Sequence, residues 1–146
     1  MNRFELCRVT TGKVEYFDIL IDGRPLAEYF AGPLGAVPDS ISPLGPLGAE
    51  IKQYRQEQFE RFLLERDPDL HEGRNSILVC PLCGDLGCGA YSARFQQEGD
   101  VIKWSEFGYE NNYDPASVEL DRFKLMSSFV FLWNEYSAEL RRYLGA

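Results

Sequence analysis

Three cysteines lie within nine residues of this chain, at a spacing that suits a metal ion. Two residues separate Cys80 from Cys83, and Gly84 follows directly. This is the spacing of a zinc knuckle, because two such thiolates converge on one tetrahedral ion and glycine lets the backbone turn around it. Cys88 is a third candidate ligand, and the remaining candidates for a fourth ligand are Cys7, His71 and Asp85. The alternative is that the three thiols pack as small apolar groups where two strands meet.

A second group of chemically capable side chains lies in residues 104–114, which we call the acidic-aromatic stretch. Four aromatic residues alternate there with three acids and two asparagines. Aromatic rings supply contact area at protein interfaces, and carboxamides supply hydrogen bonds. The predicted partner-binding residues are Trp104, Glu106, Tyr109, Glu110, Asn111, Asn112 and Asp114. The alternative is that the rings close the end of a sheet while the acids face water.

The distribution of charge favours a basic partner. The chain carries a formal net charge of −8, and between Glu98 and Asp121 it has seven acids against one base, Lys103. Such a field attracts basic proteins and repels polyanions, so we expect no nucleic-acid ligand. The alternative reading is an exposed loop whose acids are simply solvated.

The sequence contains none of the common catalytic motifs. There is no Gly-x-Ser-x-Gly, no phosphate-binding loop, no dinucleotide fingerprint and no His-Glu-x-x-His, and His71 is the one histidine. We therefore expect a non-enzymatic protein. Because neither a signal peptide nor an apolar run of 18 residues is present, we expect a cytoplasmic protein that does not bind membranes, with its thiols reduced or metal-bound.

The length of 146 residues and the 45% hydrophobic content indicate one domain, residues 1–146. At its N-terminus, alternation over residues 4–9 and 14–21 predicts a hairpin. Residues 26–30 are either a short strand or a helical turn. Residues 31–50 carry four prolines and four glycines, so we expect a connector without regular structure that lies on the body of the protein.

The second half of the chain predicts a three-stranded antiparallel meander. Its strands are residues 77–80, 90–95 and 101–104, with a turn at Glu98-Gly99 that sets Phe95 opposite Ile102. Apolar residues recur at helical spacing in residues 50–66 and 132–144, and residues 129–131 resemble a last strand. The predicted fold is α+β: a mainly antiparallel sheet, made of the hairpin and the meander, with two amphipathic helices on one face.

Residues 77–114 resemble a group of small bacterial proteins of unassigned function. The resemblance rests on Cys80-Pro81-Leu82-Cys83-Gly84-Asp85-Leu86-Gly87-Cys88-Gly89, then a strand, then Trp104-Ser105-Glu106-Phe107-Gly108. It implies that the cysteine turn, residues 80–89, and the acidic-aromatic stretch belong together in the folded protein.

Two functional hypotheses follow from these patterns. The first is an acidic binding protein that docks a basic protein partner, and a bacterial immunity or antitoxin-type inhibitor is its sharpest form. The second is a small zinc protein that holds the ion through Cys80, Cys83 and Cys88, with a structural or unknown catalytic role.

Overall fold

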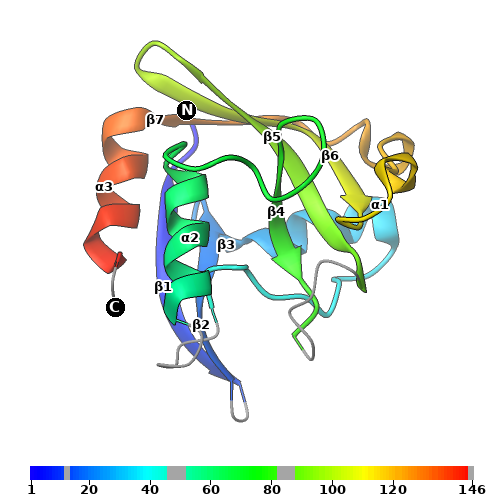
Figure 1. Cartoon of the computed structure of the whole chain (residues 1–146), viewed down its shortest axis with the longest axis horizontal. Helices are drawn as coiled ribbons and strands as arrows, with labels where there is room; N and C mark the ends of the chain where they lie inside the picture. Colours follow the sequence, from blue (N-terminus) through cyan, green and yellow to red (C-terminus); the bar gives the residue numbers. More distant parts are fainter. Residues whose placement is uncertain (12–13, 46–51, 82–87, 145–146) are drawn as a thin grey trace.

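The computed structural model describes residues 1–11, 14–45, 52–81 and 88–144 (Figure 1). This part of the chain is an α+β fold with two antiparallel sheets, one in the order β1-β2-β3 and one in the order β4-β5-β6-β7. The predicted class is thus confirmed. The predicted arrangement, one sheet with two helices, is only partly right, since the described residues form two sheets and three α-helices.

The N-terminal hairpin is confirmed. Strand β1 (Phe4–Thr11) pairs with β2 (Val14–Ile21) along its whole length. Strand β3 (Arg24–Pro25) extends this sheet by two residues, and Leu26–Phe30 is a 3-10 helix, η1, rather than a strand. Alternate residues of β2 are buried because only one face of the sheet meets the core.

The predicted three-stranded meander is partly right: its strands belong to a four-stranded antiparallel sheet, and the strand expected at residues 77–80 is residues 74–79. The strands are β4 (Arg74–Val79), β5 (Ala90–Glu98), β6 (Val101–Glu110) and β7 (Phe129–Leu132).

The predicted pairing of β5 with β6 is wrong, because the two turn residues are Gly99 and Asp100 and not Glu98 and Gly99. Phe95 pairs with Trp104 and Gln97 with Ile102, so the turn follows Glu98 instead of including it. This moves the pairing by two residues. A shift of two leaves every side chain on its face, so the predicted inward set is retained.

A β-bulge in β6 determines which residues face the core. Ser92 pairs with Gly108 and Arg94 with Ser105, so Glu106 and Phe107 together lie opposite one residue, and Glu106 has a φ of 52°. The extra residue changes the alternation from even to odd positions. Trp104 before the bulge and Phe107 after it therefore both enter the aromatic core.

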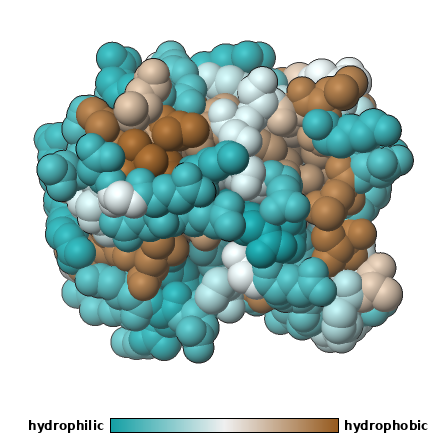
Figure 2. Space-filling model, turned by 90° about the horizontal axis from the view of Figure 1, so that it is seen from above, coloured by the Kyte–Doolittle hydropathy of each residue, from teal (hydrophilic) through white to brown (hydrophobic). Residues whose placement is uncertain are grey.

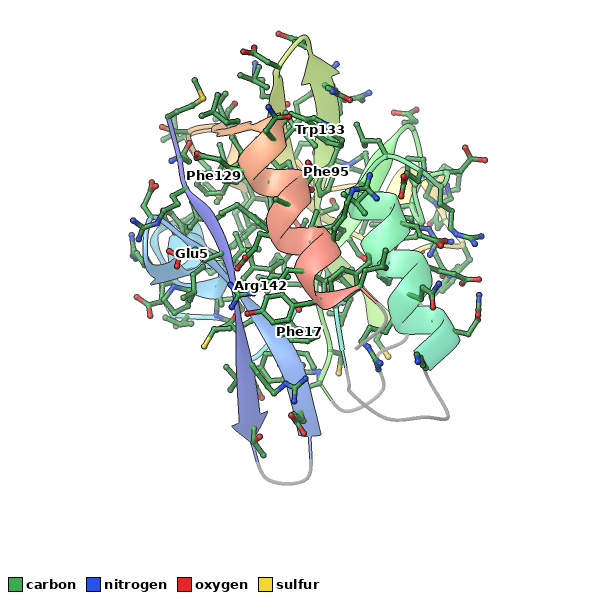
Figure 3. All side chains as sticks on the ribbon, turned by 90° about the vertical axis from the view of Figure 1, so that its left-hand side faces the viewer. Glu5, Phe17, Phe95, Phe129, Trp133 and Arg142 are labelled. Carbon is green, nitrogen blue, oxygen red and sulfur yellow. The ribbon has the colours of Figure 1, made fainter. Side chains whose placement is uncertain are left out.

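Two of the helices join the two sheets. Helix α2 (Lys52–Phe62) and helix α3 (Trp133–Tyr143) confirm the predicted helices with shorter bounds. Figure 3 shows α3 between β1 and α2. The buried Tyr136 hydroxyl of α3 donates a hydrogen bond of 2.8 Å to the Phe62 carbonyl of α2.

Trp104 lies at the centre of the core. Its ring stacks on Phe95 with centroids 4.5 Å apart and meets Phe4, Phe62, Phe131 and Tyr136 edge-on. Both sheets, α2 and α3 contribute to this one hydrophobic cluster.

The proline-rich connector is more ordered than the sequence predicts. Residues 31–34 form a single helical turn, α1 (Ala31–Leu34), which corrects the expectation of no regular structure. The connector lies on the body of the protein, as expected. Ser42 and Leu44 are buried, and the Ser42 hydroxyl donates to the Phe17 carbonyl. Residues 46–50 lie outside the described part.

Candidate functional site

The structure divides the acidic-aromatic stretch into a buried part and an exposed part. Trp104 and Glu110 lie inside the protein, so the expectation that these two face a partner is wrong. The exposed residues are Glu106, Tyr109, Asn112, Tyr113 and Asp114, while Asn111 is half-buried.

Glu110 belongs to a buried polar cluster that joins three strands. Its Oε2 accepts hydrogen bonds from Arg74 Nε at 2.7 Å and from Ser92 Oγ at 2.5 Å, and Arg74 Nη2 donates to Ser92 Oγ at 2.9 Å. The Arg74 side chain is 2% exposed and that of Glu110 is 0% exposed. A Cβ at position 108 would lie 2.9 Å from Arg74 Nη2 and 2.9 Å from the Glu119 carbonyl oxygen, so a larger residue there would force the cluster or the backbone to shift. Glu110 is therefore a structural counter-ion with no role on the surface.

The other acids of residues 98–121 do not form one acidic face. Glu106 pairs with Arg94 at 2.6 Å, and Glu119 and Asp121 pair with nearby bases of their own segment. Glu98 and Asp100 lie at the tip of the β5–β6 hairpin, whereas Asp114 follows the far end of β6. That strand has ten residues, so these two groups are ~30 Å apart along it. The expected concentration of negative charge on a single surface is corrected accordingly.

The β6–β7 connection, residues 111–128, begins with a turn that is stabilised by its own polar groups. The Asn111 side chain accepts hydrogen bonds from the backbone of Tyr113 and Asp114, and Asp114 caps the 3-10 helix η4 (Pro115–Ser117). Ser117 Oγ accepts from Asn111 N at 3.0 Å and donates to the Asp114 carbonyl at 2.7 Å. Two predicted partner-binding residues, Asn111 and Asp114, thus use hydrogen-bonding capacity within the turn.

Large hydrophobic side chains are exposed around this connection. Four of the eight exposed large hydrophobic residues in the described part lie between positions 109 and 125: Tyr109, Tyr113 (72% exposed), Leu120 and Leu125 (91% exposed). We call these four residues the hydrophobic surface. Figure 2 shows hydrophobic side chains on both the left-hand and the right-hand parts of the upper face, and Figure 1 places the connection on the right. Sequence reasoning missed both leucines because no helical or strand periodicity marks them.

A groove of about 510 Å³ lies beside the hydrophobic surface. Strand β7 pairs with β6 up to Trp104, and the next pairing on that side, among the described residues, joins Tyr109 to Glu119. The groove opens in the gap between these pairings. Its walls include Lys103 and Glu106 of β6 and Leu120, Phe123, Lys124 and Met126 of the connection. The 3-10 helix η5 (Asp121–Phe123) is fixed there by the buried Phe123 ring, 5.6 Å from that of Phe30.

One of the three predicted zinc ligands lies outside the described residues. Cys80 is half-buried and Cys88 is exposed, while Cys83 belongs to residues 82–87, which the structure does not describe. Among the described residues, no group of three or more His, Cys, Asp or Glu side chains is placed to hold a metal ion. The zinc knuckle stays a prediction, and metal analysis of protein purified without chelator checks it.

The end of the cysteine turn contacts the acidic-aromatic stretch. The Tyr109 hydroxyl donates to the Cys88 carbonyl at 3.2 Å, and a Cβ on Gly89, whose φ is 101°, would lie 2.3 Å from that hydroxyl. The Tyr109 ring also packs on Tyr91 with centroids 4.9 Å apart. Burial and then the neighbouring Tyr109 raise the pKa of Tyr91, so this phenol is neutral at physiological pH. Cys88 and Gly89, at the described end of the cysteine turn, therefore lie against Tyr109.

No family model, curated protein or solved structure matches this chain. Among the described residues, no helix is both long and apolar enough to cross a bilayer.

Proposed function

We propose that this protein is a binding protein that docks a protein partner through the hydrophobic surface around the β6–β7 connection. The observation that carries the proposal is the exposure of Tyr109, Tyr113, Leu120 and Leu125 within 17 residues. Grouped exposed hydrophobic side chains mark interaction sites on soluble proteins, and tyrosine is frequent among the residues that dominate binding energy.

The local structure supports this proposal. Hydrogen bonds within residues 111–117 and the buried Phe123 ring hold the backbone that carries the exposed side chains. A surface ordered before binding loses less conformational entropy when a partner docks. The exposed leucines are thus presented by a preorganised segment.

The charges around the surface modify the expectation of a basic partner. Glu106, Glu110 and Glu119 are in ion pairs, and Asp121 has a weak, exposed one, whereas Asp114 has none among the described residues, so the acids here are only partly available to a basic partner. We propose that apolar contact dominates recognition. The toxin-neutralising form of the hypothesis requires a basic partner whose association slows steeply as salt is added.

Photo-crosslinking tests the proposal. A benzoyl-phenylalanine placed at Tyr113 or Leu125 should capture the same protein in cells, whereas the same group at the exposed Leu132, at the end of β7, should not. With the captured partner purified, Leu125→Ser should weaken binding by about 10-fold or more and Leu132→Ser should leave it unchanged. Identical capture from all three positions, or full affinity of the Leu125→Ser variant, would refute the proposal.

A further inference from the structure

The groove beside the hydrophobic surface carries two lysines on facing elements. Lys103 lies on β6, is half-buried, and takes part in no ion pair with any described residue. Lys124 lies on the connection, 3.7 Å from Asp121, whose side chain is 94% exposed. An ion pair of that kind is weak, so the Lys124 ammonium is available to a bound anion.

The opposing charge in the groove is already neutralised. Glu106 lines the groove, but its Oε2 accepts a hydrogen bond of 2.6 Å from Arg94 Nε. Counting the groove residues with their ion-pair partners gives three bases, Lys103, Lys124 and Arg94, against two acids, Glu106 and Asp121. The groove therefore has a local charge of opposite sign to the −8 of the whole chain, and it favours an anionic group.

Apolar side chains line the groove between these charges. Phe107 and Phe123 are buried residues that reach its inner wall, and Leu120 and Met126 lie nearer the rim. A groove of about 510 Å³ has room for more than a simple anion. Concave sites with apolar walls and a few placed charges select ligands that carry both features.

We propose that the groove binds a segment of the protein partner in which a carboxylate adjoins an apolar side chain. The carboxylate lies between Lys103 and Lys124, and the apolar group covers Phe107 and Phe123. This inference rests on the proposed function and adds to it the chemistry of the partner. The hydrophobic surface and the groove share Leu120, which is exposed and also lines the groove.

Decanoate, which joins a carboxylate to an apolar chain, tests the groove without the partner. Titrated into ¹⁵N-labelled protein, it should shift the amide resonances of residues 103–107 and 120–126 with a Kd of about 1 mM. Decylammonium has the same chain and the opposite charge, and it should bind about 5-fold more weakly. Lys103→Gln should weaken decanoate by about 5-fold, and the matched variant Lys52→Gln, on α2, should not. Equal binding of the two amphiphiles, or equal behaviour of the two variants, would overturn the inference.

Competition between decanoate and the partner, identified by crosslinking and then purified without a crosslink, decides whether the carboxylate comes from the partner. Decanoate should displace the partner, and Lys103→Gln should weaken partner binding by about 5-fold or more while Lys52→Gln does not. Decanoate binding without displacement would overturn the assignment to a partner segment and indicate a small free carboxylate. If a partner is captured at Leu125 and its affinity is unchanged by Lys103→Gln, the proposed function stands and this inference is refuted. Absence of any captured partner would instead remove the proposed function, whatever the titration shows.

Discussion

Residues 104–110 and residues 111–126 have similar compositions and opposite environments. Both contain aromatic rings and acids, yet the first segment supplies Trp104, Phe107 and Glu110 to the interior, and the second leaves Tyr113 and Leu125 in water. The first belongs to β6, which pairs with β5 along these residues, so Trp104 and Phe107 enter the hydrophobic core and Glu110 is buried against Arg74 and Ser92. The second forms 3-10 turns at the edge of the sheet, where only Phe123 is anchored in the core.

This comparison shows that the environment of an acid depends on residues far away in the sequence. Glu110 is buried because Arg74, 36 residues earlier, lies on the adjoining part of the sheet. Asp114, four residues later, has no ion pair among the described residues and caps a turn. The same type of side chain therefore forms a buried ion pair at Glu110 and caps an exposed turn at Asp114.

The largest expected effect is loss of the buried charge pair. Glu110→Gln keeps the side-chain shape but leaves Arg74 without a counter-ion, so we expect a loss of about 3 kcal/mol in the free energy of unfolding, measured with urea. Asp114→Asn, the surface counterpart, should change stability by less than about 0.5 kcal/mol. Equal stability of the two variants would show that Glu110 is solvated in solution.

The double variant Arg74→Met/Glu110→Leu sharpens the same point. It removes both charges and leaves neither unpaired, so it should be more stable than Glu110→Gln. If the double variant loses more free energy of unfolding than Glu110→Gln, the hydrogen bonds of the cluster to Ser92 stabilise the fold as much as its charges do.

A smaller effect is expected where the cysteine turn meets Tyr109. Gly89→Ala should cost about 2 kcal/mol, because φ is 101° and the new methyl group would meet the Tyr109 hydroxyl. Gly99→Ala, where φ is 63° and nothing lies within 4 Å, should cost about 1 kcal/mol. Thermal unfolding of the two variants, Gly89→Ala and Gly99→Ala, measures the difference in stability. Equal melting temperatures would mean that the contact between Gly89 and Tyr109 does not stabilise the protein.

The exposed leucine should contribute almost nothing to folding. Leu125→Ser is expected to change the free energy of unfolding by less than about 0.5 kcal/mol, because 91% of that side chain is in water. Phe123→Ala, two residues away and buried, should lose about 3 kcal/mol. A strongly destabilised Leu125→Ser variant would show that this leucine packs against the protein in solution.

The smallest effect concerns an acid outside the compared regions. Asp22 accepts hydrogen bonds from Arg3 N and Asn2 Nδ2, and these lower its pKa from the ordinary value of 3.8. Its carboxylate therefore stabilises the fold above pH 3.8, and this contribution is lost as the pH falls through the lowered pKa. Compared with Asp22→Asn, the wild type should be more stable at pH 6 and should lose its advantage towards pH 2. If the difference in stability between the wild type and Asp22→Asn is the same at pH 6 and pH 2, the charge of Asp22 is not its cause.

Much of the fold could be predicted because it depends on local periodicity. The hairpin partners, the meander and two of the helices follow from alternation and helical spacing. The residues of β5 and β6 that face the core can be predicted even though the turn between the strands is misplaced. A change of two residues in the pairing leaves each side chain on the same face of the sheet. The separation into two sheets and the helical turn at residues 31–34 could not be predicted, because both depend on packing between distant segments.

The candidate site was predicted less well. The burial of Trp104 depends on strand pairing, and the burial of Glu110 depends on Arg74 and Ser92, which lie far from it in the sequence. Leu120, Leu125 and the groove were missed, because exposure and concavity belong to surfaces that several segments build together.

The order of amino acids by itself determined the α+β class, the strands and helices, and the local charge of each segment, because these follow from short-range periodicity and composition. The tertiary structure decided which acid is buried against Arg74, which rings fill the core, and which leucines face water. Those outcomes depend on contacts between residues far apart in the chain, and no local pattern specifies them.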